Sequence, residues 1–65
     1  MNRPVYFNWK GAQGRETVDE ARPQDFATFK DFRREVAKLC REYNLCGMAV
    51  YTSSRPCANW KGGAK

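Results

Sequence analysis

Apolar residues recur every three or four positions across residues 28–43, and this spacing predicts an amphipathic helix. Thr28 and Asp31 suit its N-terminal cap, because the Thr28 hydroxyl can accept a hydrogen bond from a first-turn amide. We expect Asn44 to end the helix and Leu45 to fold back onto its last turn. The residues expected to face the core are Phe29, Phe32, Val36, Leu39, Cys40 and Tyr43.

Two stretches with a two-residue period predict β-strands on either side of the helix. Residues 5–18 predict a β-hairpin, whose first strand alternates a larger apolar set, Trp9 included, with Tyr6 and Asn8. Residues 47–52 alternate in the same way and predict a third strand. The pattern is typical of an α+β protein with its elements in the order strand, strand, helix, strand (ββαβ).

This order favours one small domain, residues 1–65, in which the amphipathic helix packs on a three-stranded sheet. A right-handed crossover would place the third strand parallel to the second and beside the first. We expect residues 53–60 to return and pack against this domain, because Pro56 redirects the chain and Trp60 can complete a small core. Residues 61–65 are expected to form a tail.

A single helix covers only one face of such a sheet, so the other face would carry Tyr6 and Tyr51. That face can be solvated, can stack nucleic-acid bases, or can pair with another protein or with a second copy of the chain in a homodimer. In the return segment, Arg55 is the candidate partner contact, since arginine and tryptophan are also enriched in interfaces.

The chain carries a net charge of +5, and the charges of the helix are sorted by sign. Asp31, Glu35 and Glu42 lie on one flank of its polar side. A basic stripe suits phosphate or an acidic protein surface, and it is also compatible with a solvated face. The basic residues of the other flank are Lys30, Arg34, Lys38 and Arg41.

Catalytic, metal and membrane chemistry have little support in the sequence. The chain has no histidine, its three cysteines form no Cys-x-x-Cys pair, and no apolar run approaches the roughly 20 residues of a membrane span. A Cys57 nucleophile would depend on Arg55 to lower its pKa. We therefore expect no enzyme, no metal, no cofactor, no small-molecule substrate and no membrane association, and a cytoplasmic location.

Several short motifs resemble proteins of unknown function that tailed bacteriophages and prophages encode. The motifs are the strand "ETVDE" at 16–20, Phe26 before the helix cap, Tyr43 at the helix end, and "SSRPCANW" at 53–60. The resemblance implies a phage-type accessory protein in a bacterial cytoplasm, and it implies no catalytic or binding residue.

These observations predict a non-enzymatic protein-interaction module that binds a host or phage protein, a second copy of itself, or both. The alternative is a nucleic-acid-binding protein that uses the basic helix flank or the tyrosine-bearing sheet face.

Overall fold

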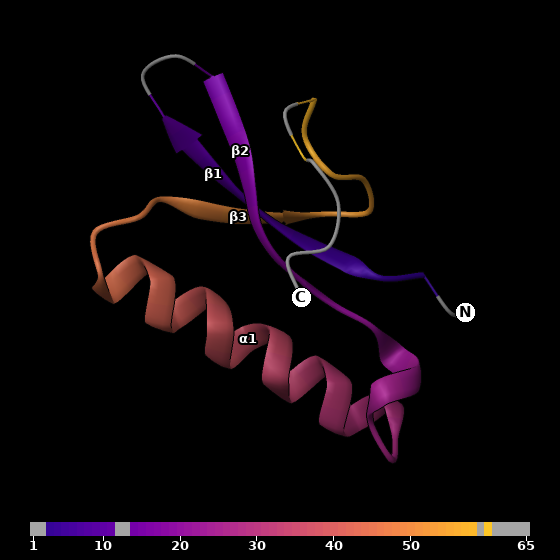
Figure 1. The fold of residues 1–65 in the computed structure, drawn as a ribbon. Helices are drawn as coiled ribbons and strands as arrows, with labels where there is room; N and C mark the ends of the chain where they lie inside the picture. Colours follow the sequence, from indigo (N-terminus) through magenta and orange to yellow (C-terminus); the bar gives the residue numbers. More distant parts are fainter. Residues whose placement is uncertain (1–2, 12–13, 59, 61–65) are drawn as a thin grey trace.

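One helix lies against one face of a three-stranded antiparallel sheet, so the predicted α+β fold is confirmed. The computed structural model describes residues 3–11, 14–58 and 60; the tail expected at 61–65 lies outside them. Figure 1 shows the helix on one side of the sheet and the segment after the last strand on the other. The helix therefore covers one face of the sheet, and the segment after the last strand lies against the other face.

The first strand, β1 (Val5–Gly11), is the middle strand of the sheet. It pairs antiparallel with β2 (Gly14–Ala21) on one side and with β3 (Val50–Ser53) on the other, so β3 lies beside β1 as predicted. The second strand continues past residue 18, where the sequence pattern placed its end. The third strand begins later than the expected residue 47, because the helix and its terminating turn occupy the preceding residues.

Helix α1 (Phe29–Leu45) starts where the sequence predicts, with the Thr28 hydroxyl accepting a hydrogen bond from the amide of Asp31 at 3.1 Å. It ends later than predicted, since Gly47 and not Asn44 adopts the left-handed conformation, with φ of 90°. The Gly47 amide donates to the Asn44 carbonyl and the Met48 amide to the Tyr43 carbonyl, which is a Schellman motif. The Asn44 side chain instead accepts from the amide of Val50 and ties the helix end to β3.

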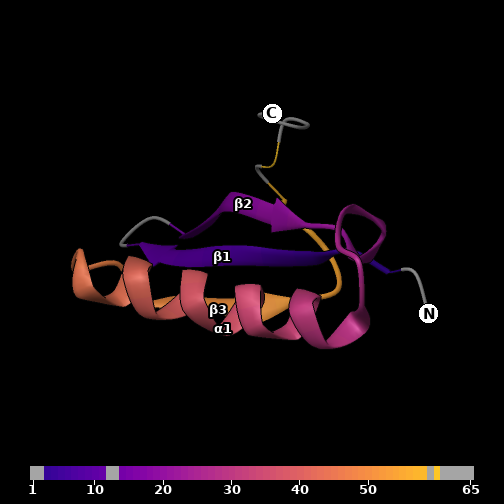
Figure 2. The same ribbon diagram turned by 90° about the horizontal axis from the view of Figure 1, so that it is seen from below.

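Phe7, at the centre of β1, is fully buried and forms the core with Ala21 and Phe32. Figure 1 shows α1 below the sheet, and Figure 2, seen from below, shows it in front of β3, the strand it lies nearest to. The Phe7 ring lies 6.1 Å from that of Tyr43 between their centroids. The residues packed around this core are Val5, Val18, Phe26, Val36, Leu39, Cys40, Tyr43 and Val50.

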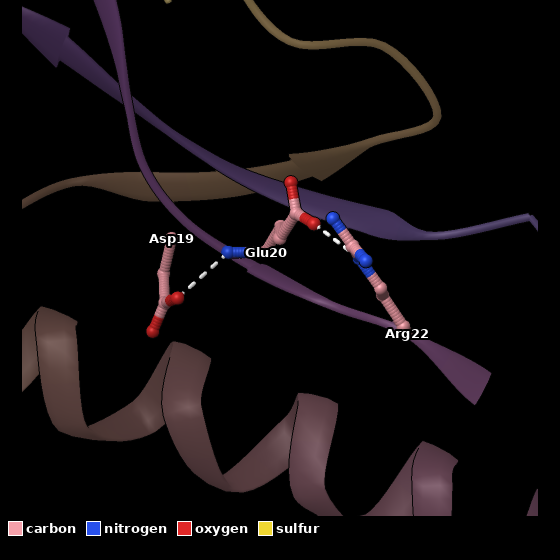
Figure 3. Close-up of polar contacts among 3 residues, drawn as sticks. All are labelled: Asp19, Glu20 and Arg22. Carbon is pink, nitrogen blue, oxygen red and sulfur yellow. Dashed lines mark hydrogen bonds and ion pairs between the residues drawn. The ribbon is translucent and has the colours of Figure 1, made fainter. Parts of the chain in front are cut away.

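A β-bulge in β2 changes which side chains face the helix. The pairing register shifts after Phe7, so that Phe7 lies opposite Asp19, and Asn8 lies opposite Thr17. Val18 then packs in the core while the neighbouring Asp19 accepts a hydrogen bond from the Tyr43 hydroxyl at 2.9 Å. Two consecutive residues on one face are what a bulge produces. Figure 3 shows Asp19 extending toward α1 and Glu20 toward the other side of the strand.

Two expectations about the helix ends are wrong. Phe29 was expected in the core but is 56% exposed, and Leu45 was expected to fold back but is 80% exposed. Phe29 is the first residue of α1, and side chains on a helix lean toward its N-terminus, so this ring extends beyond the buried part of the helix. Leu45 stays in solvent because the Schellman turn carries the chain on toward β3.

The face of the sheet opposite α1 is built around Asn8, whose side chain is 1% exposed. The Thr17 hydroxyl donates to Asn8 Oδ1 at 2.7 Å and accepts from the Cys57 amide at 2.8 Å. Asn8 Nδ2 donates to the carbonyl of Arg55 at 3.5 Å. The return segment, residues 53–60, is therefore attached to the sheet by buried polar groups; its residue 59 lies outside the described part.

Replacing Asn8 by alanine should destabilise the protein by about 1–3 kcal/mol, because the buried Thr17 hydroxyl and the partly buried Arg55 carbonyl would each lose a hydrogen-bond partner. Urea unfolding of Asn8→Ala measures this. Ser54→Ala, at an exposed position of the same segment, is the matched control and should unfold like the parent. Equal midpoints for the two variants would contradict the role given to Asn8.

Tyr43 makes the stability depend on pH in the alkaline range. Burial, and then the hydrogen bond to Asp19, raise the pKa of Tyr43 to about 12. An unfolded tyrosine ionises near pH 10, so the stabilisation from Tyr43 is complete below about pH 10 and is lost as the pH rises through 12.

The free energy of unfolding should therefore fall more steeply between pH 10 and 12 in the parent than in Tyr43→Phe. At neutral pH the variant should be less stable by roughly 1 kcal/mol, since it lacks the hydrogen bond to Asp19. Denaturant titrations at a series of pH values provide both curves. Curves that stay parallel up to pH 12 would show that the Tyr43 hydroxyl contributes nothing.

Candidate functional site

The residues predicted to bind a partner fall on two surfaces, one on each side of the sheet. Lys30, Arg34, Lys38 and Arg41 lie on the helix, whereas Arg55 follows β3. Tyr51 lies opposite Asn8, and Tyr6 opposite Ser53, in the pairing of β1 with β3, on the side that faces away from α1. The two sets therefore form separate candidate sites.

The solvent-facing side of α1 carries a row of cations, which we call the basic helix face. Every member is exposed, and none forms an ion pair or hydrogen bond with another residue in the described part of the chain. Arg33 was missed by the sequence analysis, which sorted charges into two flanks and left this position out. The basic helix face consists of Lys30, Arg33, Arg34, Lys38 and Arg41.

The spacing of these cations places like charges next to one another. Lys30 and Arg34 are four residues apart, and so are Arg34 and Lys38. Like charges at this spacing destabilise an exposed helix by about 0.2–0.5 kcal/mol for each pair. Within the described residues no carboxylate lies within ion-pair distance of these side chains. An anionic partner would relieve this repulsion.

A shallow depression of about 430 Å³ lies at the N-terminal end of the basic helix face. Its lining residues are Phe29, Lys30, Arg33 and Arg34. The exposed Phe29 ring leans on the buried ring of Phe32, with their centroids 5.6 Å apart. The depression thus combines an aromatic surface with three cations.

The opposite flank of α1 is acidic, as the helical projection predicts. Asp31 and Glu42 are exposed, and Glu35 is half-buried. The outer surface of the helix therefore offers a basic side and an acidic side, and it would match a partner that carries both signs of charge.

The second surface is more covered than the sequence suggested. The Tyr6 and Trp60 rings pack edge to face, with their centroids 6.3 Å apart. Tyr6, Tyr51 and Trp60 are all half-buried. The return segment therefore covers part of the face that was expected to be open for stacking bases or for a second copy. Arg55 keeps an exposed side chain, while its amide donates to the Ser53 hydroxyl.

Acidic groups on the edge strand are engaged within the fold. Glu20, whose side chain is 7% exposed, forms an ion pair with the half-exposed Arg22 (Figure 3). Glu20 raises the pKa of Arg22, first through the hydrogen bond between the two side chains and then through its negative charge. Asp19 accepts from the Glu20 amide at 2.7 Å as well as from Tyr43. Of these contacts, the one between Asp19 and Tyr43 connects β2 to α1.

Neither a metal site nor a membrane helix is found in the part of the chain that the structure describes. No group of three cysteine, aspartate or glutamate side chains there is close enough to hold a metal ion. No helix there is long and apolar enough to cross a membrane.

The three cysteines are thiols in different surroundings. Cys40 packs against the core and burial raises the pKa of its thiol, whereas Cys46 is exposed. The Cys57 amide is the group that contacts Thr17. With Cys40 further from the thiolate form than a free cysteine, this side chain suits packing better than nucleophilic attack.

Comparison of the chain with protein-family models, with curated proteins and with solved structures gave no match. The resemblance to short phage proteins stays a prediction.

Cys46 should react with a thiol reagent much faster than Cys40 in the folded protein, because Cys40 is packed and its pKa is raised. Alkylation followed by peptide mass spectrometry gives the rate at each position. In urea the two rates should become similar, and Cys46→Ser should show slow labelling when folded. Rapid labelling of Cys40 in the folded protein would contradict its place in the core.

Proposed function

We propose that this protein acts by binding an acidic protein through the basic helix face, without catalysis. The observation that carries the proposal is the row of five exposed cations, none of them in an ion pair within the described residues. Charged surfaces of this kind speed association and select partners of opposite charge. The resemblance noted in the sequence supports a host or phage protein in a bacterial cytoplasm as the partner.

Apolar groups on α1 favour a protein partner over a nucleic acid. Phe29 and Leu45, the large exposed hydrophobic residues of the described chain, both lie on this helix, one at each end. Protein interfaces combine apolar anchors with arginines in this way. The phosphate backbone of a nucleic acid would make no apolar contact with the Leu45 side chain. A nucleic-acid base could stack on the Phe29 ring, but that would leave Leu45 exposed.

The acidic flank of α1 gives a second reason. A nucleic acid presents negative charge along its whole length, so a strand crossing the helix would meet the exposed carboxylates of Asp31 and Glu42. A protein can present acidic residues to the basic helix face and basic residues to this flank. Complementarity with both flanks therefore favours a protein.

The return segment is the weaker candidate surface, because Tyr6 and Trp60 already contact each other. This internal contact also leaves less apolar area for a second copy of the chain. A dimer through Tyr6 and Tyr51 thus has less support than the sequence alone gave it.

The test compares two variants with the same change of charge. Arg34→Glu/Arg41→Glu reverses two charges of the basic helix face, and Arg3→Glu/Arg55→Glu reverses the charges of two exposed arginines elsewhere. Each protein is used to capture partners from a bacterial lysate that has been treated with nuclease. The captured protein is then purified, and its affinity for each variant is measured.

We expect the control variant to bind the captured protein like the parent, and the helix variant to bind it at least roughly tenfold more weakly. Loss of binding in the control variant alone would move the site to Arg3 or Arg55. Capture that nuclease abolishes, together with polynucleotide binding that falls steeply with salt, would replace the proposal by the nucleic-acid alternative.

A further inference from the structure

The depression at the start of α1 has a composition that points to a particular ligand. Three cations, Lys30, Arg33 and Arg34, line it together with the exposed Phe29. We infer that this depression takes an aromatic side chain flanked by carboxylates in the acidic partner. The inference rests on the proposed function and names what the partner must present.

The Phe29 ring is held in place although it is exposed. It contacts Phe32, which is 4% exposed, and the Phe32 ring meets that of Phe26 with centroids 5.8 Å apart. Phe29 is thus the outer end of a row of three aromatic rings anchored in the core. A ring that is already ordered loses little conformational entropy when a ligand covers it, which is what makes an aromatic residue an effective anchor.

An aromatic ligand group suits the depression better than an aliphatic one. It can pack against Phe29 in a tilted or edge-to-face arrangement, and the guanidinium groups of Arg33 and Arg34 can lie over its face. Contact with an aromatic ring also removes apolar area of Phe29 from water. The ring alone, however, leaves the three positive charges without counterparts.

Carboxylates beside that ring supply the missing charge. Arg33 and Arg34 can each hold a carboxylate through two parallel hydrogen bonds, and Lys30 can add a third contact. The anions also relieve the repulsion between Lys30 and Arg34, which are four residues apart on the helix. The ligand that satisfies both the ring and the cations is an acidic segment with an aromatic residue inside it.

The test uses two synthetic probes, a fluorescent polyglutamate peptide with a central tryptophan and the same peptide with alanine at that place. Fluorescence anisotropy at fixed salt gives the dissociation constant of each. The parent should bind the tryptophan peptide roughly tenfold more tightly than the alanine peptide. In Phe29→Ala this preference should disappear, while the affinity for the alanine peptide stays unchanged.

Leu45→Ala is the matched control, since Leu45 is also a large exposed hydrophobic residue but lies at the far end of the helix and does not line the depression. Any contribution of Leu45 to affinity should be the same for both peptides. Leu45→Ala should keep the preference for tryptophan. Arg33→Glu/Arg34→Glu should lower the affinity for both peptides. Circular dichroism should show that all three variants fold, because the replaced side chains are exposed.

A preference for tryptophan that persists in Phe29→Ala would overturn the inference. That result would leave the proposed function standing if Arg33→Glu/Arg34→Glu still lowers the affinity for both peptides. If neither peptide binds and a single-stranded oligonucleotide of the same charge does, the inference and the proposed function both fail. Equal binding of the two peptides by the parent would also overturn the inference.

Discussion

The structure depends on the middle strand being buried on both of its faces. Phe7 and Asn8 are neighbours in β1, their side chains lie on opposite sides of the sheet, and both are nearly inaccessible to water. The side of Phe7 is closed by apolar packing against α1, and the side of Asn8 by hydrogen bonds with Thr17 and the return segment. A domain this small cannot build two apolar cores, so one of its two layers is polar.

This constraint accounts for the packing of the return segment against the sheet. Buried polar side chains cost free energy unless their hydrogen bonds are made, and two backbone groups of the return segment each bond one such side chain. The Cys57 amide donates to Thr17, and the Arg55 carbonyl accepts from Asn8. The Trp60 ring then covers Tyr6. The segment contributes its backbone as much as its side chains.

Periodicity predicted the fold well, because the strand and helix patterns report which faces are apolar. It predicted α1 and its cap, since the Thr28 hydroxyl acts on residues close in sequence. It failed at the bulge beside Val18, which depends on pairing across strands, and at the role of Asn8, whose partners are distant in sequence. For the site, it found the basic helix face without Arg33 and assigned Phe29 to the core, because a periodic pattern cannot tell where the covering sheet stops.

The features left over from folding are those that point to a partner. Thr28, Phe32 and Gly47 each have a part in starting, packing or ending α1. The row of neighbouring cations does not, and the Phe29 ring stays more than half exposed although it contacts Phe32. Both have a cost, the cations through like-charge repulsion and the ring through exposed apolar area. In a domain with so little stability to spare, the same partner would offset both costs if it brought an apolar group and negative charge to one place. That coincidence at the first turns of α1 is the physical argument for a binding surface there.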